Sequence, residues 1–298
     1  MIVAGDLTKR RGDHAVVSGV TFRCEPGTIT GFLGPNGAGK TTTMRVMVGL
    51  TPATSGRVTI GGHLYKDIPN PGLHVGVLLD ASAQHAGRTG REILTLAQRT
   101  TRMPKSRVDE MLEVVSLTPE ESGRRVRDYS LGMRQRLGIA TALIGEPEVL
   151  VLDEPANGLD PAGIRWMRDL LRGYADQGGT VLLSSHLLHE IEVVADDLVV
   201  IGTGRIVAAG TKNELLASAG TYAGATDVAA LAAALTTAGH SASPSLGGVR
   251  TDADAAQVGR LALAAGVPLT ELRPADGAGL EEMFLELTKN DAREGAAA

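Results

Sequence analysis

Cysteine, aromatic residues and long apolar runs are all scarce in this sequence of 298 residues. Cys24 is the single cysteine, so no intramolecular disulfide forms, and we expect a buried thiol in a reducing compartment. Aromatic residues make up 3% of the chain, but apolar residues in total reach 43%, enough for globular cores. No apolar run approaches the ~18 residues of a membrane span, and no basic leader precedes an apolar stretch. We therefore expect neither a membrane span nor export.

A large excess of charge is also missing, because 29 Lys and Arg stand against 34 Asp and Glu, a net charge of −5. From Ser218 onward there are 5 basic and 10 acidic residues, which leaves residues 1–217 neutral. A neutral body with an acidic tail lacks the clustered basic face that nucleic-acid binding needs. Nucleic acid is therefore not an expected partner.

Short β-branched segments alternate with helix-like segments through residues 1–217, a pattern that predicts an α/β fold with a parallel sheet covered on both faces. The expected strands are residues 27–34, 149–153, 180–185 and 197–202. The expected helices are residues 41–50, 91–100, 106–117, 133–144 and 161–177. Strand signals vanish between about residues 80 and 143, which predicts a mostly helical subdomain there.

A domain boundary is expected near residues 217–221, followed by a small α+β C-terminal accessory domain over residues 218–298. The expected elements are helices 228–238 and 253–265, capped by Asp227 and Asp252, a hairpin at 246–248, a strand at 268–273 and an amphipathic helix at 280–289. This order predicts a split βαβ sandwich. Nothing in it indicates a catalytic or metal site, and two roles stay open: a module that stabilises a dimer, or a substrate sensor.

The segment GPNGAGKT at residues 34–41 fits the phosphate-loop pattern Gly-x-x-x-x-Gly-Lys-Ser/Thr between an expected strand and helix. Its glycines let backbone N–H groups converge on phosphate, Lys40 supplies a positive charge, and the Thr41 hydroxyl can bind Mg²⁺. The predicted nucleotide-binding residues are Gly34, Pro35, Asn36, Gly37, Ala38, Gly39, Lys40, Thr41 and Thr42.

Two carboxylates end the strand at residues 149–153: Asp153, suited to hold Mg²⁺, and Glu154, suited to polarise a water molecule. His186 follows the strand at residues 180–185, and parallel strands place these ends at the same sheet edge as Lys40. Together these groups predict nucleotide hydrolysis, with Glu154 and His186 as catalytic residues.

These motifs, with YSLGMRQR at 129–136, LDEPANGLDP at 152–161 and SSH at 184–186, resemble the ATP-binding subunits of ABC transporters in order and spacing. The resemblance covers residues 1–217. It implies a P-loop NTPase fold with an ABC-type helical subdomain, an ATPase activity, and ATP and Mg²⁺ as cofactors. His186 matches the residue that contacts the γ-phosphate in this family.

The resemblance also implies a dimer, either a homodimer or a heterodimer, with two shared ATP sites. Ser130 and Gly132 match the signature that contacts the ATP of the partner subunit, and Ser130 can also cap the helix that follows it. Asn157, Gly158 and Asp160 match the loop that communicates between subunits, although such a sequence also suits an ordinary turn.

Three departures from the family pattern stand out. Leu131 and Met133 replace usual signature residues, and Arg11 lies where an aromatic residue stacks on adenine. Asp80 occupies the place of a glutamine that faces the metal and the attacking water, while Gln84 comes four residues later. We expect Asp80 to be a metal ligand together with Thr41 and Asp153.

The variants YSLGM at 129–133, LLD at 78–80, GRTGREIL at 87–94 and GLEEMFLEL at 279–287 resemble bacterial ATPases of antibiotic and multidrug efflux. This resemblance implies export of a drug, antibiotic or similar small molecule through a separate multi-span membrane permease. The permease would grip the helical insert and hold the chain at the cytoplasmic face of the membrane. The alternatives are a soluble ABC-type ATPase and a regulatory module not coupled to transport.

Overall fold

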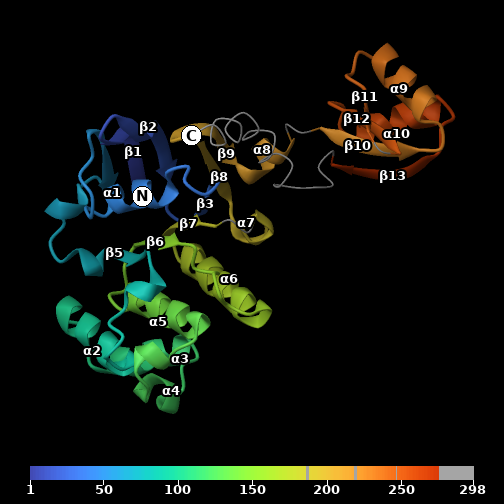
Figure 1. Cartoon of the computed structure of the whole chain (residues 1–298). Coiled ribbons are helices and arrows are strands. Elements are labelled where there is room, and N and C mark those ends of the chain that lie inside the picture. Colours follow the sequence, from blue (N-terminus) through green and yellow to red (C-terminus); the bar gives the residue numbers. More distant parts are fainter. Residues whose placement is uncertain (186–187, 218–219, 246, 275–298) are drawn as a thin grey trace. The chain divides into compact units, whose positions relative to one another are not determined.

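The computed structural model describes residues 1–185, 188–217, 220–245 and 247–274, and the chain divides into two compact units, Met1–Ala209 and Gly210–Ala298 (Figure 1). The division falls within strand β9 (Arg205–Thr211), ahead of the segment 217–221 where the sequence places a boundary. Helix α8 (Lys212–Ala217) follows β9 without a break, so the local sequence around the division carries no loop signal.

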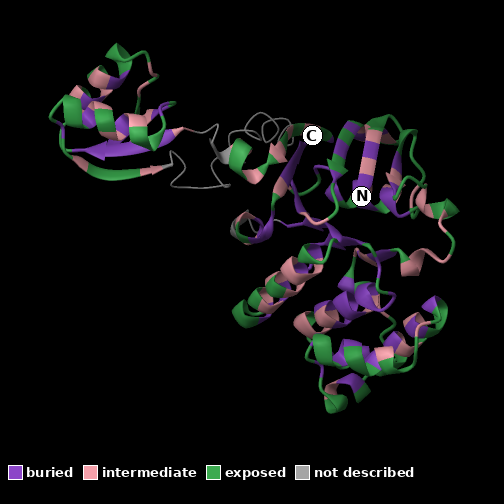
Figure 2. Cartoon of the chain, turned by 180° about the vertical axis from the view of Figure 1, so that it is seen from behind, coloured by how far each residue is buried: buried purple, intermediate pink, exposed green. Residues whose placement is uncertain are grey.

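A six-stranded sheet forms the centre of the first unit, in the order β5-β6-β7-β3-β8-β9. Besides β9 its strands are β3 (Ile29–Leu33), β5 (Val75–Leu78), β6 (Val149–Asp153), β7 (Thr180–Ser184) and β8 (Asp197–Gly202). The pairs from β5 through β8 are parallel, as the sequence predicts. Every residue of β3, β6 and β7 is buried (Figure 2). The register sets Ser184 beside both Phe32 and Asp153, so the carboxyl ends of three neighbouring strands meet at one edge.

A second sheet, which the sequence patterns did not predict, is antiparallel in the order β2-β1-β4. Its strands are β1 (Ile2–Arg11), β2 (His14–Cys24) and β4 (Ser55–Ile60). Its buried face shares one core with the first sheet, where the rings of Phe22 and Phe32 stack 5.4 Å apart. Cys24 is fully buried in this core, as expected, and burial raises the pKa of its thiol to about 12.

Helices flank the sheet and form the predicted insert between residues 80 and 143. The helices beside the sheet are α1 (Lys40–Met47), α6 (Pro161–Asp176) and α7 (Leu188–Val194). The insert contains α2 (Gly90–Thr101), α3 (Ser106–Val114), α4 (Pro119–Gly123) and α5 (Leu131–Leu143), with no strand. Capping boxes begin α2 at Thr89 and α4 at Thr118. Among the described helices, none combines the length and the apolar character that a membrane crossing needs.

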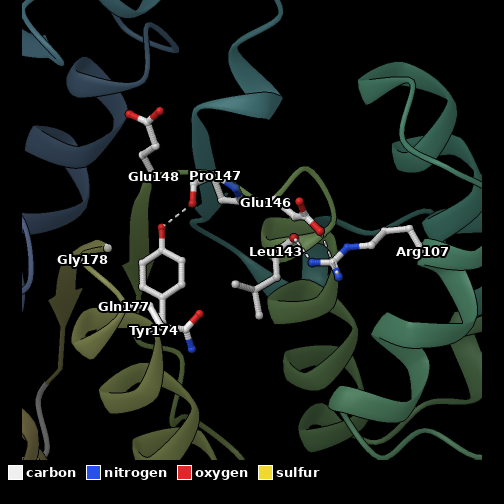
Figure 3. Close-up of a pocket in the computed structure, with 9 residues that line it drawn as sticks. Arg107, Leu143, Glu146, Pro147, Glu148, Tyr174, Gln177 and Gly178 are labelled. Carbon is white, nitrogen blue, oxygen red and sulfur yellow. Dashed lines mark hydrogen bonds and ion pairs between the residues drawn. The ribbon is translucent and has the colours of Figure 1, made fainter.

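The C-terminal end of α5 is fixed by Arg107 from α3 (Figure 3). The guanidinium donates to the carbonyl oxygens of Leu143 and Ile144, each at 3.3 Å, and lies 3.4 Å from the carboxylate of Glu146. Cations at a helix C-terminus satisfy carbonyl groups that have no partner within the helix. These contacts line a hollow of about 480 Å³, across which Tyr174 donates its hydroxyl proton to the Pro147 carbonyl at 2.7 Å.

The second unit is a four-stranded antiparallel sheet in the order β11-β12-β10-β13. Its elements are β10 (Thr221–Ala225), α9 (Val228–Thr237), β11 (Ser243–Ser245), β12 (Gly248–Thr251), α10 (Ala255–Ala264) and β13 (Leu269–Pro274). Apolar residues of both helices pack with Val249 of the sheet, which gives the predicted split βαβ sandwich.

One predicted helix cap in the second unit is correct and one is wrong. Asp227 caps α9, but Asp254 rather than Asp252 caps α10. Asp252 instead accepts the backbone N–H of Ser241, because β12 extends to Thr251 and delays the helix start. The expected helix at 280–289 lies outside the described residues.

The contacts of Arg107 predict that its replacement lowers the free energy of unfolding more than the replacement of Arg91, another arginine of the insert. Replacing Arg107, whose side chain is 18% exposed, by Met removes two hydrogen bonds to α5 and should cost about 1–2 kcal/mol of unfolding free energy. The control Arg91→Met breaks an exposed ion pair with Asp109 and should cost less than about 0.5 kcal/mol. Urea unfolding followed by Trp166 fluorescence measures both values, and equal losses would contradict the role of Arg107.

Candidate functional site

The phosphate loop joins the carboxyl end of β3 to α1, as predicted, and its glycines fit spaces that larger residues cannot occupy. A Cβ atom on Gly34 would lie 2.4 Å from the Ile201 carbonyl oxygen. Gly39 has φ +109°, and a Cβ atom there would lie 2.9 Å from the Val16 carbonyl oxygen. The loop therefore packs directly on β8 and β2, immediately before the start of α1.

A hollow of about 250 Å³ lies above this loop. It is lined by Asn36, Gly37, Gly39, Lys40, Thr41, Thr42 and Glu154. The structure thus brings the predicted phosphate loop and the predicted catalytic carboxylate, more than a hundred positions apart in the sequence, into one site. Gly34, Pro35 and Ala38 complete the loop outside this lining.

Lys40 lies at the base of the hollow and is 7% exposed. Its ammonium group donates to the carbonyl oxygens of Gly34 at 2.6 Å and Pro35 at 3.3 Å. Burial lowers the pKa of this ammonium from its ordinary value, while the carboxylates of Glu154 and Asp153 oppose the shift. A phosphate group in the hollow would add negative charge and favour the protonated form further.

Asp153 ends β6 and is 7% exposed. The Thr41 hydroxyl donates to one carboxylate oxygen at 2.5 Å, and the Ser184 hydroxyl donates to the other. Mg²⁺ prefers hard oxygen ligands and retains several waters, so a hydroxyl and a carboxylate are sufficient protein ligands beside a phosphate. The paired oxygens of Thr41 and Asp153 fit Mg²⁺.

Glu154 follows Asp153 with φ 50°, a left-handed backbone that is rare for a residue with a side chain. Its N–H group donates to the carbonyl and hydroxyl oxygens of Ser184, at 3.2 and 3.1 Å. Its carbonyl oxygen accepts from the Asn157 N–H at 3.1 Å and from the Gln135 amide at 3.2 Å. Strained backbone that is stabilised by neighbouring hydrogen bonds is common at functional sites, where it fixes the direction of a side chain.

The predicted signature begins α5, where the Ser130 hydroxyl accepts from the Met133 N–H at 3.2 Å and confirms the expected cap. Gly132 contacts the loop after β6 closely, because a Cβ atom there would lie 2.8 Å from the Gly158 carbonyl oxygen. Ser130 and Gly132 do not line the hollow at the phosphate loop. Leu131 is 44% exposed, and nothing in the structure explains its replacement of the usual residue.

The predicted communication loop lies between β6 and α6. Asp160 caps α6 by accepting from the Gly163 N–H at 2.8 Å, and the Asn157 N–H binds the Glu154 carbonyl. Gly158 has φ +77° and lies against the side chain of Leu131. Within one chain the loop is therefore a turn that follows Glu154, contacts the start of α5 and leads into α6.

Asp80 and Arg11 do not line the hollow at the phosphate loop. The Asp80 carboxylate accepts from the Ser82 hydroxyl and N–H at 2.6 and 2.7 Å, and the hydroxyl contact chiefly lowers its pKa. In the described ranges no three His, Cys, Asp or Glu side chains are grouped so that they could hold a metal ion. Arg11 is exposed at the hairpin between β1 and β2. His186 lies outside the described residues.

Two residues that support the site, Ser184 and Gln135, were not predicted from the sequence. Ser184 ends β7 beside Asp153 and binds both predicted carboxylate residues. Its signal in the sequence was a hydroxyl residue at the end of an apolar strand. Gln135 is 5% exposed within the quoted signature segment, and its signal was a polar residue on the buried side of a helix.

Comparisons with known proteins agree with this geometry. A family model described as ABC transporter matches residues 17–157. The chain is 41% identical over 210 residues to the bacitracin transport ATP-binding protein BcrA of Bacillus licheniformis, covering 70% of this chain and 68% of that protein. It is 41% identical over 225 residues to the daunorubicin resistance ATP-binding protein DrrA3 of Streptomyces coeruleorubidus, covering 74% and 71%.

Solved structures confirm the predicted P-loop NTPase fold with its helical subdomain. The structure of an ATP-binding subunit of an ABC transporter superposes with a TM-score of 0.67 at 27% identity, covering 72% of this chain and 91% of that one. A dimeric ATP-binding cassette bound to ADP and Pi, MJ0796, has the same fold, with a TM-score of 0.65 at 20% identity, covering 71% and 98%. The phosphate loop, the carboxylates at the strand ends and these relatives together show that the chain belongs to the ABC transporter family, as an ATP-binding ATPase.

Proposed function

We propose that this ATPase powers export of an antibiotic, drug or similar small molecule through a separate membrane permease. The observation that carries the proposal is the site at the carboxyl edge of the sheet, where Lys40, Thr41, Asp153 and Glu154 converge. The transported class is supported by the relatives, whose names specify bacitracin transport and daunorubicin resistance. The linearmycin resistance protein LnrL of Bacillus subtilis, 33% identical over 225 residues, adds a third antibiotic.

Each residue of this site has a separate role in the proposed hydrolysis of ATP. Lys40 and the amides of the phosphate loop bind the phosphates of ATP. Thr41 and Asp153 would hold Mg²⁺, which supplies charge neutralisation at the transferred phosphate. Glu154 aligns the attacking water and accepts its proton, and the family resemblance assigns the contact with the γ-phosphate to His186. Ser184 keeps Asp153 oriented through its hydroxyl group.

A dimer would complete each site. Ser130 and Gly132 lie at the start of α5, outside the hollow at the phosphate loop of their own chain. A serine cap and a free helix N-terminus are suited to bind an anion, which the γ-phosphate of a second subunit would supply. The loop that contains Asn157, Gly158 and Asp160 would then communicate between the two ATP sites of the dimer. ATP binding closes such a dimer and hydrolysis opens it, by a shift in population.

The role of Glu154 predicts separate effects on hydrolysis and binding. Glu154→Gln removes the base but keeps the shape of the site, so ATP turnover should fall by at least about 100-fold while ATP binding persists. The control Glu148→Gln changes an exposed acid just before β6 and should leave both properties unchanged. Phosphate release and nucleotide affinity are measured together. Turnover of Glu154→Gln at the wild-type rate would remove Glu154 from this role.

We also propose that Asp80 is a Mg²⁺ ligand together with Thr41 and Asp153, which predicts a change in the magnesium dependence of ATP hydrolysis. Asn can accept the Ser82 N–H in the same way, so Asp80→Asn removes the charge and retains the turn. The concentration of Mg²⁺ that gives half-maximal ATPase activity should rise in this variant, but not in Asp67→Asn, which changes an exposed acid elsewhere. A magnesium titration that superposes on the wild type would show that Asp80 serves only as a cap.

Purification from native membranes tests the transport role directly. The tagged chain should bring down a multi-span membrane protein in fixed stoichiometry, as mass spectrometry measures, together with a second ATP-binding subunit. The tagged Glu154→Gln chain is the matched control, because it should retain the partner without turnover. Recovery of soluble protein alone, with ATP turnover intact, would favour a soluble ABC-type ATPase over a transporter subunit.

A further inference from the structure

The side chain of Gln135 connects the helical subdomain to Glu154, the residue that follows the carboxyl end of β6. It extends from the second turn of α5, is 5% exposed, and donates its amide proton to the Glu154 carbonyl oxygen at 3.2 Å. The contact therefore joins the helix that carries Ser130 to the backbone of the residue that aligns the attacking water.

The backbone of Glu154 needs such support. Its φ of 50° places it in the left-handed region, which a residue with a side chain adopts only when neighbouring groups hold it there. Ser184 holds its N–H group from β7, and Asn157 binds its carbonyl oxygen from the following turn. Of these three holding contacts, Gln135 supplies the one from the helical subdomain.

A buried glutamine at this position is not explained by packing. Its Oε1 atom is buried without a hydrogen-bond partner in the described part of the chain, which costs stability that an apolar side chain of similar size would not lose. The amide N–H is therefore the feature that distinguishes glutamine from leucine at this position.

A second glutamine binds α5 at the adjacent residue. Gln84, in the loop after β5, donates to the Arg134 carbonyl oxygen at 3.0 Å. The same turn of α5 is thus tied to the loop that contains Asp80 and to the backbone of Glu154. Arg107 holds the other end of the helix, so α5 is fixed at both ends to defined neighbours.

We propose that Gln135 is a positioning residue for Glu154, which holds the carboxylate in line with the attacking water and makes this alignment depend on the position of α5. The inference rests on the proposed function of Glu154 as the base. Gln135 lies five positions after Ser130, about 7.5 Å along a helix. A rigid α5 therefore transmits a displacement of its N-terminus to the Glu154 backbone.

The test compares two buried glutamines in the full chain. Gln135→Leu removes the N–H donor and should lower the single-turnover rate of ATP hydrolysis by about tenfold, roughly the effect of one lost hydrogen bond in the transition state. The dissociation constant for ATP, measured with a fluorescent nucleotide, should change less than about twofold. Gln98→Leu is the control, because Gln98 is also buried, at 7% exposed, and donates to a backbone carbonyl away from the site, that of Met103.

A second measurement separates positioning from general stability. In the Glu154→Gln background, Gln135→Leu should cause no further loss of residual turnover, because the base it positions is absent. Equal effects of Gln135→Leu in both backgrounds, or equal effects of Gln135→Leu and Gln98→Leu, would overturn the proposal. Gln135→Met replaces Gln135→Leu if the latter does not fold, and failure of both to fold would assign Gln135 a purely structural role. Absence of hydrolysis in the wild type would instead overturn the proposed function, and the positioning role with it.

Discussion

The site depends on the carboxylate of Asp153, which accepts hydrogen bonds from the hydroxyl groups of Thr41 and Ser184. Thr41 lies at the start of α1, Asp153 at the end of β6 and Ser184 at the end of β7. Each side chain comes from a different βα connection, and the parallel register brings their strand ends to one edge. The pairing of the Thr41 and Asp153 oxygens and the position of Glu154 beside the phosphate loop follow from this alignment.

The helical subdomain is connected to that edge through α5. Arg107 satisfies the carbonyl groups at the C-terminal end of the helix, while Gln135 binds the strained backbone of Glu154 near its beginning. Gly132 and Gly158 allow the helix start and the loop after β6 to approach closely, because neither carries a Cβ atom. The proposed role of Gln135 rests on this attachment of α5 at both of its ends.

Strands with an uninterrupted apolar pattern were readable from the sequence, whereas the antiparallel sheet was not. In β1 the register shifts at Leu7 and Lys9, and Asp6 adopts a positive φ. These bulges break the alternation of buried and exposed residues on which strand prediction depends. The cap of α10 failed for a related reason, because two Asp residues stand within three positions and the extent of β12 chooses between them.

The sequence by itself determined the chemistry: the phosphate loop, the two carboxylates after a buried strand and the signature segment are local patterns whose spacing specifies residue types. Tertiary structure decided which groups support that chemistry. Ser184 and Gln135 act through contacts with residues 30 and 19 positions away in the chain. Contacts of this kind depend on how separate elements pack, and no short-range pattern records the distance between them.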